Sequence, residues 1–161
     1  FKESQSRVRS MALIHQKLCQ AASLAQVDLG QHLRDLAQTL SRSYGAANVA
    51  VVVDVEDVSL GLDTVVPFTL IVHELITTAL KYAFPDGRAG TIRLALRSAG
   101  ENLFELVVRD DGVGLAEHID VGRAPSLGLQ LVSALAEQLE GTLRVARDRG
   151  TTVALTFRDV R

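Results

Sequence analysis

Two pairs of closely spaced β-type segments constrain the fold of this chain most. Residues 91–97 and 103–109 are separated by Ser-Ala-Gly-Glu-Asn, and residues 142–146 and 151–157 are joined across Asp-Arg-Gly. Runs of β-branched and apolar residues bounded by such turn residues are typical of strands, and strands joined by short turns pair antiparallel. A further β-branched run predicts a strand over 49–55. We therefore expect a mixed, mostly antiparallel sheet.

Helical patterns separate these strands. Apolar residues at three- and four-residue steps predict helices over 28–45, over 67–84 with Pro67 at its start, and over 126–139. Residues 56–63 read as a turn or a short strand, and residues 111–125 as a polar loop. Each helix is apolar on one side, so the helices form a layer that covers one side of the sheet. The sequence predicts a two-layer α/β sandwich of the α+β type, in which helices cover one face of a mixed, mostly antiparallel sheet.

The first residues carry a narrower apolar stripe. Over residues 3–22, apolar side chains recur at three- and four-residue steps, which suits a coiled coil or helical bundle whose partner helix is not in this chain. We expect a bundle-type helix over 1–25, a globular domain over 26–161, and a longer parent protein. His15 lies at the edge of the stripe, so we interpret it as a packing residue rather than a phosphoacceptor.

Composition excludes several function classes. The net charge is −2 and the pI about 6.1, so no overall basic field exists to hold nucleic acid. The single cysteine, Cys19, excludes an intrachain disulfide and a multi-cysteine metal cluster, and fits a reducing compartment. No apolar run approaches the roughly 18 residues of a membrane span, and no signal peptide is visible. With 47% hydrophobic but only 4% aromatic residues, the core must be aliphatic.

The stretch Val-Val-Arg-Asp-Asp-Gly-Val-Gly-Leu at 107–115 is the strongest local signal of function. A strand would bring Asp110 to the rim of the sheet, and Gly112 and Gly114 would let the backbone turn and pass close to a ligand. A carboxylate held there can accept a hydrogen bond from an exocyclic amine such as that of adenine. Similar turns occur in many loops, so the motif needs support from the rest of the chain.

The helix over 67–84 carries polar residues on one face. At 100° per residue, Thr78 lies about 40° to one side of Glu74 and Lys81 about 20° to the other, opposite an apolar face that packs on the sheet. Glu74 could orient water or act as a base, Lys81 could hold a phosphate, and Thr78 could offer an oxygen to Mg²⁺. The alternative is a solvated surface helix. For the neighbouring His73 we expect a partly buried side chain with a structural hydrogen bond.

Two downstream segments have both a structural and a functional interpretation. Ser126-Leu-Gly-Leu-Gln130 opens a helix, and Gly128 in its first turn favours either anion binding at free backbone amides or ordinary packing. Gly150-Thr-Thr152 is a hairpin turn followed by strand residues, and a hydroxyl beside a ligand pocket is a further possibility.

Taken in order, these segments resemble the ATP-binding domain of sensor histidine kinases, within the family that includes gyrase, Hsp90 and MutL. The resemblance covers nearly the whole chain. His73-Glu-Leu-Ile-Thr-Thr-Ala-Leu-Lys-Tyr82 is similar to the N box, Asp110-Asp-Gly-Val-Gly114 to the G1 box, Ser126-Leu-Gly-Leu129 to the G2 box, and Gly150-Thr-Thr152 to the terminal GT motif. Residues 7–18 and the phrase Lys-Tyr-Ala-Phe-Pro-Asp-Gly at 81–87 resemble one histidine kinase subgroup.

The resemblance implies a Bergerat-type fold that binds ATP and Mg²⁺ between the N-box helix and a lid at about 115–125. Asp110 would recognise adenine, Glu74 and Lys81 would be catalytic, and Thr78 would contact the metal. The nucleotide-binding set would be Thr77, Thr78, Lys81, Asp110, Gly112, Gly114, Leu127, Gly128, Leu129 and Thr151.

The resemblance also implies a phosphorelay partner and a homodimer. The γ-phosphate would pass to a histidine on a neighbouring helix and then to an aspartate of a response regulator, in a cytoplasmic protein that dimerises through its N-terminal bundle. Nucleic acid and membrane are not expected as partners.

Two departures from the family pattern matter. The family usually has Asn at the position of Thr78, so metal affinity should fall, and the helix with the acceptor histidine would lie before Phe1. A degenerate kinase-like scaffold is therefore an alternative. An anti-sigma-type serine kinase is a third, which the bundle-like helix over 3–22 disfavours.

Overall fold

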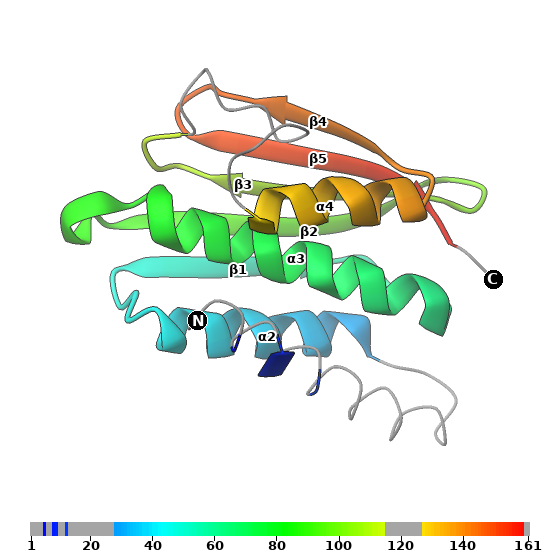
Figure 1. Ribbon diagram of the computed structural model, residues 1–161, viewed down its shortest axis with the longest axis horizontal. Helices are drawn as coiled ribbons and strands as arrows, with labels where there is room; N and C mark the ends of the chain where they lie inside the picture. Colours follow the sequence, from blue (N-terminus) through cyan, green and yellow to red (C-terminus); the bar gives the residue numbers. More distant parts are fainter. Residues whose placement is uncertain (1–4, 6–7, 10–11, 13–27, 115–126, 160–161) are drawn as a thin grey trace.

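The computed structural model describes Gln5, Val8, Arg9, Ala12, residues 28–114 and residues 127–159 (Figure 1). The predicted N-terminal helix, with His15 and Cys19, falls almost wholly outside the described residues, and so do the predicted lid and Ser126. Those predictions stay as predictions.

A five-stranded sheet forms one layer of the molecule. Its order is β1-β2-β3-β5-β4, where β1 pairs parallel with β2 and the remaining neighbours pair antiparallel. The mixed, mostly antiparallel sheet predicted from the sequence is confirmed. The strands are β1 (Val49–Val55), β2 (Gly90–Gly100), β3 (Leu103–Asp110), β4 (Thr142–Ala146) and β5 (Thr151–Arg158).

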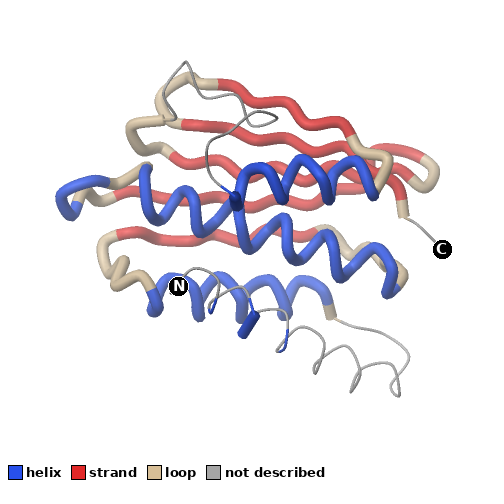
Figure 2. Tube along the Cα trace, viewed as in Figure 1, coloured by secondary structure: helices blue, strands red, loops and turns tan. Residues whose placement is uncertain are grey.

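The longer helices of the described residues lie together on one face of this sheet, as Figures 1 and 2 show. Asp28 caps the first of them by accepting a hydrogen bond from the Gln31 backbone N–H, 3.1 Å from Oδ1, which confirms the predicted helix start. A short 3-10 turn follows the second helix. The elements are α2 (Leu29–Ser43), α3 (Leu62–Tyr82), η1 (Pro85–Gly87) and α4 (Leu127–Gln138).

The predicted start of α3 at Pro67 is wrong, because the helix begins at Leu62. The extra turn is held by Asp159, whose Oδ1 accepts hydrogen bonds from Gly61 N at 3.1 Å and from Thr64 Oγ1 at 2.6 Å. Pro67 forfeits only one backbone hydrogen bond near the start of the helix. A cap supplied from the far end of the chain leaves no local signal in the sequence. Residues 56–60 form neither a helix nor a strand.

The core lies between the helices and the inner face of the sheet. Phe68 of α3 packs on Phe157 of β5 with ring centroids 5.4 Å apart, and the rest of the core is mainly aliphatic, as predicted. Among the described residues, α3 is the one helix long and apolar enough to cross a membrane, which corrects the expectation that no segment passes that test. Since 78% of its apolar window is buried within the fold, its apolar character is explained by the core.

Candidate nucleotide-binding site

A buried carboxylate stands where β3 ends. Asp110 is the last residue of the strand and only 7% exposed. Its Oδ1 accepts two backbone hydrogen bonds, from Gly112 N at 3.0 Å and from Thr151 N at 3.3 Å. The second bond follows from strand pairing, since Thr151 faces Asp110 across the β3–β5 ladder. Two separate chain segments therefore fix the orientation of this carboxylate.

Glycines let three backbones meet at this point. A Cβ on Gly112 would lie 2.1 Å from the Ala83 carbonyl oxygen, and one on Gly150 would lie 2.0 Å from the Asp110 carbonyl oxygen. Gly150 also has φ +117°, which disfavours a side chain. A hydrogen bond from Val113 N to Ala83 O, at 2.9 Å, ties the turn after β3 to the end of α3.

Burial raises the pKa of Asp110 above that of an ordinary aspartate. The hydrogen bonds from the Gly112 and Thr151 amides pull the pKa back down in part, and the neighbouring Asp111 charge raises it. Both of these backbone N–H groups donate their hydrogen bonds to Oδ1. Within the described part of the chain, Oδ2 is therefore the oxygen left for a donor on a ligand.

Asp110 lies in the wall of a hollow with about 430 Å³ of empty space, which includes space open to solvent. α3, β3, β5, α4 and the turn after β3 all contribute to it, and most of the side chains that line it are apolar. A mainly apolar hollow with one buried carboxylate suits a purine base with an exocyclic amine. The lining residues are Leu75, Thr78, Ala79, Tyr82, Ala83, Val108, Asp110, Gly114, Leu129, Thr151 and Val153.

The polar residues of α3 do not all reach the hollow. Thr78 lines the hollow, whereas Glu74 and Lys81 do not. Glu74 is 2% exposed, so the alternative of a solvated surface helix is wrong for this residue, and the neighbouring Thr77 is 6% exposed. Lys81 is half-buried, with its Nζ 5.9 Å from the centre of the Tyr44 ring at the end of α2.

His73 differs from its prediction. It is 1% exposed rather than partly buried, and neither ring nitrogen has a hydrogen-bond partner among the described residues. Its Nδ1 lies 3.7 Å from Glu74 Oε1, a distance for an ion pair only if the ring is protonated. The Thr77 hydroxyl, one turn further along α3, is likewise buried and has no hydrogen-bond partner in the part of the chain that the structure describes. The helix thus carries unsatisfied polar groups beside its catalytic candidates.

The other predicted site residues gather around the same hollow. Gly114, Leu129 and Thr151 line it, and Gly112 and the buried Gly128 lie within one or two residues of lining positions. Leu127 starts α4, but its side chain lies outside what the structure describes. The segment that leads into α4 is also outside, so anion binding at that helix end stays a prediction. Over the described ranges, no group of three or more His, Cys, Asp or Glu side chains could hold a metal.

Sequence reasoning missed the apolar walls. Leu75, Ala79 and Tyr82 follow helical steps along α3 beside Thr78. Val108 and Val153 face each other in the β3–β5 register, two positions inward of Asp110 and Thr151 and on the same face of the sheet. The helical spacing was visible in the sequence. The strand register was not visible there. Had Asp110 been paired with Thr151, the same register would have placed Val108 opposite Val153.

Comparison with known families assigns this arrangement to a class. The model described as histidine kinase-, DNA gyrase B- and HSP90-like ATPase matches residues 63–161, and a histidine kinase model, HisKA_2, matches residues 1–44. The chain belongs to this ATPase family. The first match contains all the predicted site residues.

Particular relatives are sensor kinases. The chain is 27% identical to blue-light-activated histidine kinase 2 of Erythrobacter litoralis, over 95% of this chain and 45% of that protein. It is 33% identical to the sensor histidine kinase PdtaS of Mycobacterium tuberculosis, over 95% of this chain and 31% of that one. The solved histidine kinase domain of the Erythrobacter litoralis EL346 kinase superposes with a TM-score of 0.83 at 26% identity, over 95% and 75% of the two chains. The chain thus spans less than half the length of these curated relatives.

Proposed function

We propose that this chain is the ATP-binding catalytic portion of a two-component sensor histidine kinase. The observation that carries the proposal is the position of Asp110: a buried carboxylate, held through Oδ1, in the wall of a mainly apolar hollow that Thr78 also lines. Family membership supports the same conclusion. Residues 1–25 would belong to a dimerisation bundle and residues 26–161 to the catalytic domain.

The adenine end of the site follows from the geometry of Asp110. Its Oδ2 would accept a hydrogen bond from the adenine amine, and the base would lie between Leu75 and Ala79 on one side and Leu129 on another. Because the carboxylate accepts but does not donate, a base with a carbonyl in place of the amine would be rejected. The site should therefore prefer ATP to GTP.

The phosphate end would use the polar face of α3. Thr78 would contribute a hydroxyl oxygen to Mg²⁺, which requires oxygen ligands and neutralises the phosphate charge when bound. Lys81 would have to turn from Tyr44 towards the phosphates. In the transfer, the bond between the γ-phosphorus and the ADP oxygen breaks, a bond to the acceptor histidine nitrogen forms, and Glu74 can hold the imidazole proton.

Calorimetric titration of the chain with ATP, with and without Mg²⁺, tests the proposal. We expect binding for the wild type and strongly reduced binding for Asp110→Asn, whose amide would present a donor to another donor. Asp111→Asn is the matched control, because the Asp111 carboxylate accepts from Thr91 N at 2.8 Å and does not line the hollow. A wild-type chain that binds no ATP at millimolar concentration refutes the proposal.

A degenerate scaffold without ATP turnover is the second candidate. It is favoured by Thr78, where the family usually carries Asn, and by the orientation of Lys81 towards Tyr44. Thr78→Asn decides between the two. Metal-dependent ATP binding that occurs only in Thr78→Asn supports the scaffold, whereas binding by the wild type supports the kinase.

The wider setting is part of the proposal. The acceptor histidine would lie on a helix outside this chain, the phosphoryl group would pass to a response regulator receiver domain, and the parent protein would be a cytoplasmic homodimer. The match of residues 1–44 to a histidine kinase model supports the presence of a dimerisation helix.

A further inference from the structure

The sheet face opposite the helices carries several charged side chains, and some of them contribute no ion pair to the described part of the fold. Side chains alternate along each strand, so one set packs in the core and the other faces away from the helices. This second set, the open face, includes Arg93 and Arg97 on β2, Arg109 on β3, Arg144 on β4, and the carboxylates Asp54 and Glu105.

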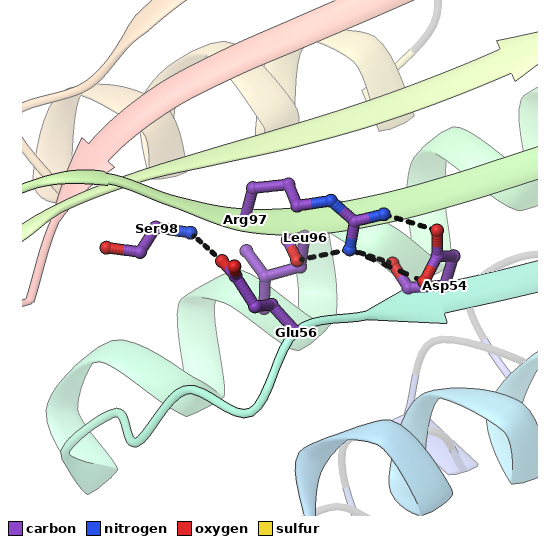
Figure 3. Close-up of polar contacts among 5 residues, drawn as sticks. All are labelled: Asp54, Glu56, Leu96, Arg97 and Ser98. Atoms are coloured by element: carbon purple, nitrogen blue, oxygen red, sulfur yellow. Dashed lines mark hydrogen bonds and ion pairs between the residues drawn. The ribbon is translucent and has the colours of Figure 1, made fainter.

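Two of these arginines are neutralised. Arg97 forms an ion pair with Asp54 across β1 and β2, and Figure 3 shows the two side chains reaching towards each other, with Glu56 accepting from Ser98 N beside them. Arg144 lies 3.6 Å from Glu105. On this part of the face the sheet supplies its own countercharges.

The other two arginines have no such partner. Arg93 and Arg109 face each other directly in the β2–β3 register, and both are exposed. Neither makes an ion pair or side-chain hydrogen bond with any part of the chain that the structure describes. Like charges opposite each other on paired strands destabilise a sheet. The fold therefore carries a local cost, in a chain whose net charge is −2.

A low apolar row runs beside the arginine pair. Ala95, Val107 and Ala154 are cross-strand neighbours on β2, β3 and β5, and all three are partly exposed. Within the row of the two arginines, Val52 faces Arg93 across β1 and β2 and is 40% exposed. Ala95 and Ala154 have smaller side chains than the neighbouring arginines, so another element can approach the sheet more closely along this apolar strip. Nucleic acid and free phosphate bind mainly through charge and hydrogen bonds, so an apolar strip would contribute little to their binding.

We propose that the open face binds an acidic amphipathic helix of a partner protein, with carboxylates on Arg93 and Arg109 and apolar side chains on Ala95, Val107 and Ala154. Complementary charge selects the partner, and the apolar strip supplies contact area. The hollow beside Asp110 lies on the helix side of the sheet, so this surface works independently of nucleotide binding.

The probe is a labelled synthetic amphipathic helix with a leucine stripe flanked by glutamates, followed by fluorescence anisotropy against the full chain. Two control peptides carry glutamine or lysine in place of glutamate. We expect the wild type to prefer the glutamate peptide, and Arg93→Glu and Arg109→Glu each to weaken that binding by about five- to tenfold. Arg42→Glu, an exposed arginine of α2, is the matched control and should bind as the wild type does.

Stability and charge exchange give independent measurements. Arg93→Glu and Arg109→Glu should each raise the melting temperature, because an attractive cross-strand pair replaces a repulsive one, whereas Arg42→Glu should not. The double variant R93E/R109E should bind the lysine peptide instead. Equal binding of the glutamate and glutamine peptides overturns the proposal, and so does binding to phosphatidylserine vesicles with none to the peptides.

Discussion

Removing the Asp159 carboxylate should destabilise the first turn of α3. In Asp159→Ala, the Gly61 amide and the Thr64 hydroxyl lose their acceptor at 3.1 and 2.6 Å. Thr64 is 0% exposed and Asp159 is 6% exposed, so water replaces these bonds poorly. Hydrogen bonds to a charged group contribute about 1.5–3 kcal/mol each, and losses that share one acceptor add incompletely. We expect a loss of about 3 kcal/mol.

The assay is equilibrium urea unfolding followed by circular dichroism. A loss of about 3 kcal/mol corresponds to a melting temperature lower by roughly 6–12 °C for a domain of this size. Asp63→Ala is the control: Asp63 is exposed in the first turn of the same helix, so its removal should cost only about 0.3–1 kcal/mol through the helix dipole. If Asp159→Ala loses no more stability than Asp63→Ala, the distant cap does not hold α3 and the explanation of its early start is wrong.

Further predictions concern the site. Gly150→Ala should destabilise the domain severely in thermal unfolding, because its Cβ would lie 2.0 Å from the Asp110 carbonyl oxygen; Gly45→Ala, also at positive φ but with nothing within 4 Å, should cost only about 1 kcal/mol. Burial raises the pKa of Asp110 in the fold, so its contribution to stability is fully present below the unfolded pKa and is lost as pH rises through the folded pKa. Asp110→Asn should therefore gain stability relative to the wild type near neutral pH and lose that advantage in acid, in urea titrations at several pH values; a constant difference contradicts it. Thr78→Asn should tighten Mg²⁺-dependent ATP binding, measured by calorimetry, and leave binding without Mg²⁺ unchanged.

Local sequence patterns predicted much of the fold. Asp28 as a helix cap, the strands around 103–109 and 151–157, and the helix layer on one face all rest on neighbouring residues, and all are confirmed. The start of α3 could not be predicted in this way, because its cap is Asp159. The buried state of His73 also escaped prediction, since helical spacing alone does not tell how closely other elements cover a residue.

The ordered motifs indicated the family, which the family match confirms. They also selected the candidate site residues, because glycines at tight backbone contacts and a carboxylate at a strand end leave a local pattern in the sequence. Local sequence patterns did not determine how these residues are arranged in space around the candidate site. Tertiary packing placed Thr78 and Asp110 in one hollow and turned Lys81 towards Tyr44. It also set Arg93 opposite Arg109, since strand register depends on the pairing of segments that are distant in the chain. A sequence specifies which groups are present, and the free energy of packing the whole chain specifies which of them meet.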